Sequence, residues 1–183
     1  MTNVFRELLG GDYGTLGRAV QDFHDHAHTH YQGTAFSGGA AHILAKTLRR
    51  IFGFPPLADD LTVDIWLSKS KGRDLWQRRF GDRRFQSSFH RNADGTLDEK
   101  FGPFRFAFRL RASEGRMYWD FERWSLLGLR LPNALGPRIE TYEAETRDGA
   151  FEFYSHADFP LIGRLVHYHG TVRPAEAQTF IGP

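Results

Sequence analysis

The sequence predicts an α+β fold in which a strongly curved antiparallel β-meander of about eight or nine strands forms a half-open barrel around one main helix, with short N-terminal helices. First, apolar and polar residues alternate from Leu75 to Leu110, in short segments separated by turn residues. Second, 15% of the residues are aromatic, 17 of them Phe, and aromatic residues favour strands. Third, helical spacing is confined to the chain before Gly53.

Size and composition favour a single domain over residues 1–183. A chain of 183 residues is long enough to bury a core without disulfides or metals. We expect a helical segment over 1–30, the main helix and the sheet over 31–173, and a loose tail over 174–183.

Composition also excludes several functional classes. The chain has no cysteine, which excludes disulfides and thiol chemistry and fits a reducing compartment. No stretch approaches the roughly 18 to 20 apolar residues of a membrane span, and no signal peptide precedes the fold, so we expect a cytoplasmic protein without integral membrane association. A net charge of only +2 argues against nucleic acid as a partner.

Three helices are expected. Apolar spacing predicts short helices over 3–9 and 15–27, with Thr15 as a candidate N-cap of the second. The main helix is predicted over 40–52, ending at Gly53, and one of its faces is apolar and therefore expected to be buried. That face consists of Ala40, Ile43, Leu44, Thr47, Leu48, Ile51 and Phe52.

Strands account for the rest of the chain. Residues 31–37 form a candidate first strand, and glycine-containing turns separate the later ones, which is typical of sequential hairpins. The predicted later strands are 61–68, 74–80, 83–91, 97–101, 104–112, 116–123, 138–147, 150–157 and 164–173.

Four histidines, His24, His26, His28 and His30, alternate at the end of the second helix. Either a strand or a helix would place at least two of them on one face, which is compatible with a divalent metal. Solvated histidines at a helix C-terminus explain the same pattern, and we favour this explanation and expect no metal site.

Two apolar stretches, 126–132 and 159–165, interrupt the strand pattern. Such segments either tuck into the core, which is our expectation, or form the rim of an apolar opening. Docking to a membrane surface is a third possibility, although neither stretch contains the basic amphipathic helix that this usually requires.

The most informative signal is a set of polar residues on the apolar face of the meander. Arg78 lies between Trp76 and Phe80, Ser87 between two phenylalanines, and Glu99 between Leu97 and Phe101. A strand period of two therefore points these polar side chains inward, and Glu143 and Tyr168 occupy comparable positions on later strands. Because an unpaired buried charge costs several kcal/mol, these groups must pair or face a ligand or water.

Two interpretations of this set remain open. In the first, Arg78 pairs internally with Glu99 or Glu143 and the pair only stabilises the sheet. In the second, aromatic walls enclose a cavity of about 300 Å³ or more that holds an apolar body, while polar groups orient its head. The candidate ligand-binding residues are Trp76, Arg78, Ser87, Glu99, Phe106, Phe108, Trp119, Glu143 and Tyr168.

Successive blocks of the chain, WQRRFGDRRFQS, EKFGPFRFAF, LLGLRLPNALGPRIE and FPLIGRLVHYHG, resemble an uncharacterised bacterial family, domain of unknown function 4166. The resemblance covers the chain from about residue 30 onward and includes the inward polar set, but not the histidine run. Members occur alone or fused behind an NAD-binding domain similar to saccharopine dehydrogenase. The resemblance implies a domain context but no established reaction.

No GxGxxG, P-loop, GxSxG or HExxH motif is present, so no common cofactor or hydrolase site has a local signature and no cofactor is expected. We favour a non-catalytic module that binds a small apolar molecule with a polar head, lipid-like or polyketide-like. The alternative is an isomerase, cyclase or dehydratase with Glu99 or Glu143 as general base and Arg78 or Tyr168 stabilising an oxyanion. A second alternative is an accessory partner of an NAD-dependent reductase, docked near 126–132.

Overall fold

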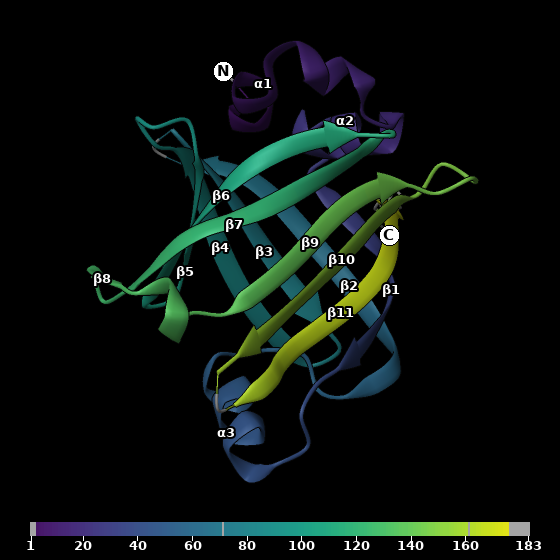
Figure 1. The fold of residues 1–183 in the computed structure, drawn as a ribbon. Coiled ribbons are helices and arrows are strands. Elements are labelled where there is room, and N and C mark those ends of the chain that lie inside the picture. Colours follow the sequence, from purple (N-terminus) through teal and green to yellow (C-terminus); the bar gives the residue numbers. More distant parts are fainter. Residues whose placement is uncertain (1–2, 71, 161, 176–183) are drawn as a thin grey trace.

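The protein is a closed antiparallel barrel of ten strands, with one additional short strand and few helices (Figure 1). The structure, a computed structural model, describes residues 3–70, 72–160 and 162–175. The barrel strands are β1 (His30–Gly38), β2 (Ala58–Ser70), β3 (Arg73–Phe80), β4 (Arg83–Arg91), β5 (Leu97–Phe101), β6 (Phe104–Ser113), β7 (Arg116–Leu126), β9 (Arg138–Glu145), β10 (Phe151–Phe159) and β11 (Gly163–Pro174).

The predicted half-open barrel is wrong, because the first and last strands pair. β1 runs antiparallel to both β2 and β11, with Tyr31 opposite Pro174 and Gly38 opposite His167. This pairing converts the meander into an up-and-down barrel and removes both sheet edges. The additional strand β8 (Leu129–Leu131) pairs only with the end of β7, and alternation did not reveal so short a segment.

All ten strands predicted by residue range are confirmed to within three residues at each end, so the predicted total of about eight or nine strands is too low. The predicted hairpins also form, for example between β3 and β4, where Phe80 faces Arg83. Lys71 of one predicted turn, Leu161 of an apolar stretch and residues 176–183 of the predicted tail lie outside the described residues.

The pairing between β7 and β9 is the shortest one in the barrel. These strands are in register only at Met117 with Glu143 and at Tyr118 with Tyr142. Beyond Tyr118, β7 is bonded on its other side to β6 and, at its end, to β8. The barrel wall therefore has a seam between β7 and the first half of β9.

The N-terminal helices close one end of the barrel (Figure 1). They are α1 (Val4–Leu9), the 3-10 helix η1 (Gly10–Thr15) and α2 (Arg18–His24). Phe5 of α1 is fully buried, 5.6 Å from the Trp76 ring and 5.7 Å from the Trp119 ring, and Phe23 of α2 stacks on Phe151 at 4.0 Å. Each large aromatic side chain buried in this way contributes on the order of 1.5–3 kcal/mol of hydrophobic stabilisation.

The start of α2 differs from the prediction that Thr15 caps it. Gly17 occupies the N-cap position, and the carboxylate of Glu145 accepts a 2.9 Å hydrogen bond from the backbone N–H of Ala19. Glu145 lies at the end of β9, so the cap comes from the barrel itself. A negative charge at a helix N-terminus also interacts favourably with the helix dipole.

The main helix α3 (Ile43–Ile51) lies at the opposite end of the barrel and not inside the sheet (Figure 1). The prediction that its apolar face is buried is wrong: Ile43 is 80% exposed and Ile51 is 66% exposed. Ala45 and Arg49 are buried instead, and Arg49 Nη2 donates a 3.2 Å hydrogen bond to the carbonyl of Ala40. The barrel interior is occupied by aromatic side chains, so the helix packs against the end of the barrel.

The two apolar stretches differ in burial. In 126–132, Leu127 and Leu129 are exposed, so the expectation that this stretch tucks into the core is wrong. In the described part of 159–165, Leu165 is buried as expected. No described helix has both the length and the apolar character needed to cross a lipid bilayer.

The closest approach of β1 and β11 yields a stability prediction. A Cβ atom at Gly33 would overlap the backbone carbonyl of Thr171, and strand pairing prevents that backbone from moving away. We expect Gly33→Ala to lower the free energy of unfolding by about 1–3 kcal/mol, as overpacking does. Urea unfolding followed by tryptophan fluorescence measures the change.

Gly11→Ala is the matched control, because nothing lies within 4 Å of a Cβ atom at that position. It is expected to change the free energy of unfolding by less than about 0.5 kcal/mol. Equal stabilities of the two variants would show that β1 and β11 are not paired as described.

Candidate functional site

The barrel encloses a cavity whose walls are mostly aromatic. The lumen contains about 1110 Å³ of space not filled by atoms, counting the part that opens to solvent, and the centre of a water molecule reaches about 130 Å³ of it. This volume of about 130 Å³ is smaller than the expected cavity of about 300 Å³, the size at which ligand pockets usually begin. The enclosed space matches a cavity that holds one benzene-sized ring.

All nine candidate ligand-binding residues line this cavity. They come from seven strands and were selected from strand alternation and the family resemblance. They are Trp76, Arg78, Ser87, Glu99, Phe106, Phe108, Trp119, Glu143 and Tyr168. Closing the meander into a barrel brings them to one lumen, because the inward side of every strand faces the same interior.

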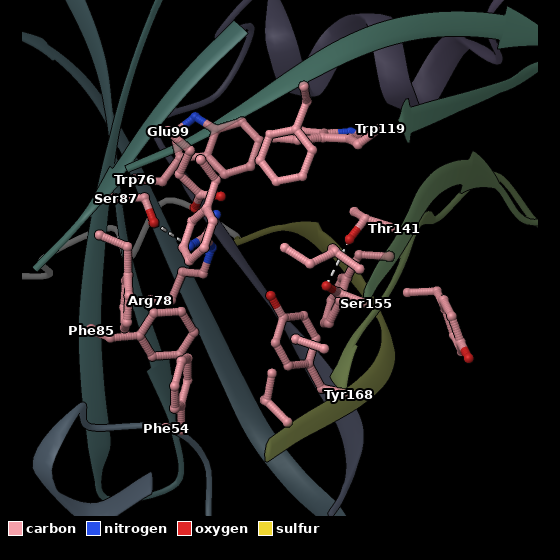
Figure 2. A pocket seen from close by; sticks show the side chains of 18 of the residues that line it. Phe54, Trp76, Arg78, Phe85, Ser87, Glu99, Trp119, Thr141, Ser155 and Tyr168 are labelled. Carbon is pink, nitrogen blue, oxygen red and sulfur yellow. Dashed lines mark hydrogen bonds between the residues drawn. The ribbon is translucent and has the colours of Figure 1, made fainter. Parts of the chain in front are cut away.

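Two polar walls face each other across the lumen (Figure 2). On one wall, Arg78 Nη1 donates a 3.1 Å hydrogen bond to the Ser87 hydroxyl, and Glu99 lies nearby (Figure 2). On the other wall, the hydroxyls of Thr141 and Ser155 are 2.7 Å apart. Polar groups are therefore present on both sides of an apolar space.

The Arg78 guanidinium lies 4.9 Å from the Trp76 ring centre and 5.3 Å from the Phe85 ring centre. Such cation–π contacts stabilise a partly desolvated charge by about 0.5–2 kcal/mol each. Among the described residues, no carboxylate lies within 4.0 Å of this guanidinium. The expected internal ion pair with Glu99 or Glu143 is therefore absent from the described structure, and Arg78 keeps donors available to the lumen.

Glu143 is paired with His24, a residue of the histidine run that was not predicted to lie near the cavity. Its Oε2 lies 2.6 Å from His24 Nε2, and the two side chains are 5% and 0% exposed. The Phe5 ring packs 3.9 Å from the imidazole and shields the pair from solvent. Because the two residues are 119 positions apart, no local spacing indicated this contact.

Glu99 is the cavity carboxyl without a basic partner in contact. Removal from water by burial raises the pKa of Glu99, and the charge of Arg78 and the hydroxyl of Ser87 oppose this rise. Burial likewise raises the pKa of the Tyr168 phenol, and Arg78 again acts in the opposite direction. A carboxyl accepts hydrogen bonds when it is ionised and can also donate one when it is protonated.

Two indole groups add unused donors. Trp76 and Trp119 line the cavity and are about 95% buried, and their Nε1–H groups donate to no atom in the described residues. A buried donor without a partner costs about 1–3 kcal/mol, so native proteins seldom retain one without a reason. These donors favour a ligand that carries hydrogen-bond acceptors.

The four histidines do not converge on one centre. His24 pairs with Glu143, His26 Nε2 lies 3.3 Å from Asp74, and His30 Nε2 lies 2.9 Å from Asp64. His28 packs against the ring of Tyr31. Over the described ranges, no three metal-ligating side chains form a group that would hold an ion.

A second, more open hollow lies on the seam between β7 and β9. It has a volume of about 590 Å³ and includes Arg111, Asp120 and Arg138 at its polar edge. Trp119, Pro137, Ile139 and Thr141 line both this hollow and the central cavity. At the seam, these four side chains therefore separate the central cavity from the surface hollow.

Sequence reasoning did not select the other residues that line the cavity, among them Thr141 and Ser155, which carry small hydroxyl side chains. The same alternation would have identified them, since Thr141 shares a face with Ile139 and Glu143, and Ser155 shares a face with Phe153.

The family described as Domain of unknown function (DUF4166) matches residues 16–172. The chain belongs to this family. Among solved structures, a protein of unknown function from the DUF3598 family of Nostoc punctiforme PCC 73102 is similar, with 12% sequence identity and a TM-score of 0.48. The match covers 80% of this chain and 47% of that protein, so the DUF4166 chain spans about half of its length. No curated protein matches the chain.

The raised pKa of Glu99 predicts a pH dependence of stability. The folded state binds the carboxyl proton more tightly than the unfolded state, so this group lowers stability as the pH rises from about 4.5 through the folded pKa. We expect Glu99→Gln to raise the free energy of unfolding at pH 7. The gain should shrink as the pH falls below 4.5, as measured by urea unfolding across the pH range.

Glu114→Gln is the control, since Glu114 is exposed in the turn between β6 and β7. It should leave both the free energy of unfolding and its pH dependence unchanged. A loss of stability on Glu99→Gln at pH 7 would mean that Glu99 is charged and firmly paired in the folded protein.

Proposed function

We propose that this DUF4166 domain is a non-catalytic module that binds a small, lipid-like or polyketide-like molecule inside the barrel. The observation that carries the proposal is an aromatic cavity in which Arg78 and two indole N–H groups have unused hydrogen-bond donors. Pockets for small molecules combine mostly apolar walls with a few convergent polar groups. The arrangement supports a ligand with an apolar body and an anionic or hydrogen-bond-accepting head.

The orientation of such a ligand follows from the difference between the two ends of the lumen, because the N-terminal helices cover only one of them. Phe5 and the His24–Glu143 pair close the end covered by α1 and α2. The head would lie near Arg78, Ser87 and Glu99, and the body would extend along the aromatic side chains toward α3, where Phe54 and Phe85 also line the cavity.

The cavity size limits what fits without rearrangement. A volume of about 130 Å³ holds a single ring, so a longer ligand must displace side chains or extend through the β7–β9 seam, where β7 and β9 pair at only two positions. Arg78 is only half-buried and forms one hydrogen bond, to Ser87, so its guanidinium can move without breaking an ion pair with a described residue.

Filling the lumen tests the proposal directly. Ser155→Phe places a ring in the cavity, and we expect it to reduce binding of the fluorophore 1-anilinonaphthalene-8-sulfonate at least tenfold. The dye is suitable because it combines an aromatic body with an anionic head. Fluorescence titration of the folded protein measures the affinity, and circular dichroism verifies the fold.

Ser68→Phe is the matched control, because Ser68 is an exposed residue of β2 and the substitution is chemically identical. It should bind the dye as the unmodified protein does. The variant Arg78→Met should weaken binding about 10-fold to 100-fold through loss of a charge-assisted hydrogen bond. Equal dye affinity of the two serine variants would place binding outside the barrel and refute the proposal.

A second candidate function is proton-transfer catalysis of the isomerase, cyclase or dehydratase type. The observation that favours it is that Glu99 lines the cavity with a raised pKa and without an ion-pair partner in contact. Such a carboxyl is suited to act as a general base, while Arg78 and Tyr168 are placed to stabilise an oxyanion. Glu143 is less suited to this role, because it is held by His24.

Isotope exchange tests this second candidate without a known product. The protein is incubated in deuterium oxide with aromatic or aliphatic ketones that bind it, and mass spectrometry follows the exchange of the C–H beside the carbonyl. Catalysis predicts exchange above the rate in buffer that is lost in Glu99→Gln. Exchange that persists in this variant would exclude Glu99 as the base.

The role as an accessory domain of an NAD-dependent reductase stays a prediction. The exposed side chains of Leu127 and Leu129 are compatible with a docking patch near 126–132. Co-purification of an NAD-binding protein with the DUF4166 domain would support this role.

A further inference from the structure

The exposed large hydrophobic side chains of the described residues gather at one end of the barrel. Neighbouring barrel strands run in opposite directions. The last residues of β1, β3, β5, β7 and β10 and the first residues of the other barrel strands therefore lie at the end of the barrel where α3 is found. We call this the α3 end. In the part of the chain that the structure describes, the exposed large hydrophobic residues are Phe36, Ile43, Leu44, Ile51, Leu57, Leu127, Leu129 and Leu135, and all belong to it.

α3 exposes a basic amphipathic surface. Ile43, Leu44 and Ile51 project outward, and Lys46 and Arg50 are exposed on the same short helix. The chain from Tyr31 to Ala58 contains no aspartate or glutamate, and the next carboxylates are the exposed Asp59 and Asp60 at the start of β2. Neither Lys46 nor Arg50 forms an ion pair with a described residue.

The helix is fixed in this orientation. His42 Nε2 donates a 2.6 Å hydrogen bond to the carbonyl of Ile162 in the β10–β11 turn, and the backbone N–H of Ala40 donates to the carbonyl of Arg164 at 2.7 Å. These bonds hold both ends of the segment that leads into α3. The apolar face is therefore presented by a defined tertiary structure.

The turn after β7 provides a second apolar projection at the same end. Leu127 adopts a positive φ of 52° and is 83% exposed, although a leucine rarely occupies the left-handed region. Its N–H donates to the carbonyl of Pro103, and the adjacent Phe104 ring lies 5.0 Å from the Phe52 ring that follows α3. Leu129 and the exposed Arg130 complete this projection.

We propose that the α3 end docks on the surface of an anionic lipid bilayer. Leucine and isoleucine side chains of α3 and of the β7–β8 turn would insert among the lipid chains, while Lys46, Arg50 and Arg130 contact anionic headgroups. This peripheral contact goes beyond ligand binding in the barrel and does not depend on it. It is compatible with the lack of a membrane-spanning helix in the described residues.

The chemistry favours a bilayer over a protein partner. Helices that lie in the membrane interface usually combine exposed aliphatic side chains, which insert shallowly into the lipid, with lysine and arginine side chains on the polar face. Each Lys or Arg near an anionic surface contributes about 1 kcal/mol of binding. Sequence analysis found no basic amphipathic helix next to the apolar stretch 126–132, and the barrel supplies one by placing α3 at the same end.

Vesicle co-sedimentation tests the proposal with the complete chain. The protein should bind vesicles of phosphatidylcholine and phosphatidylglycerol mixed in equal amounts, and bind vesicles of phosphatidylcholine alone at least tenfold more weakly. Arg50→Glu should weaken binding to the mixed vesicles about 30-fold, since it replaces one attraction by one repulsion. Ile43→Ser should weaken binding about tenfold or more through loss of inserted apolar surface.

Arg147→Glu is the matched control, because Arg147 is exposed in the β9–β10 turn at the opposite end and undergoes the same charge change. It should retain binding. Equal weakening by Arg50→Glu and Arg147→Glu would mean that only net charge matters, and would overturn the proposal.

Two further outcomes also overturn it. No sedimentation with either vesicle type refutes docking, and a dimer in solution that Ile43→Ser dissociates would assign the surface to self-association. Dye titration in the absence of lipid reports the cavity independently. Loss of vesicle binding with retained dye binding therefore refutes the docking surface and leaves the proposed function intact.

Discussion

Closure of the barrel through the pairing of β1 with β11 is the constraint on which the rest of the structure depends. Once the sheet closes, every second residue of each strand must face the interior, whatever its polarity. Arg78, Ser87, Glu99 and Glu143 are inward-facing for this reason. An open sheet would let such side chains turn toward solvent at an edge, whereas a closed barrel requires each of them to find a partner or to face a cavity.

The two buried acids meet this requirement in different ways. Glu143 is satisfied by His24, which the N-terminal helices deliver to the closed end of the barrel together with Phe5. Glu99 receives no comparable partner, and its pKa is raised by burial. The N-terminal segment thus covers one end of the barrel. Glu99 and Arg78 in the middle of the lumen keep polar atoms available there, as a binding or catalytic site requires.

The opposite end has a different character. There α3 turns its aliphatic side chains outward and contributes only Ala45 and Arg49 to the buried interior. A helix with an apolar stripe normally buries that stripe, because leaving it in water forgoes hydrophobic stabilisation. In this structure the apolar stripe of α3 is exposed, and the exposed turn at Leu127 lies at the same end. The α3 end is therefore the part of the surface where an interaction is expected.

The sequence alone determined the strands, their hairpins and the inward set, because alternation and turn chemistry are local properties that survive any arrangement of the sheet. The same alternation identifies Arg78, Ser87 and Glu99 as residues of one inward face. Only the tertiary structure decided that β1 meets β11, that His24 pairs with Glu143, that no ion pair engages Arg78 in the described structure, and that α3 faces outward. Each of these depends on contacts between residues far apart in the chain, which no local pattern encodes.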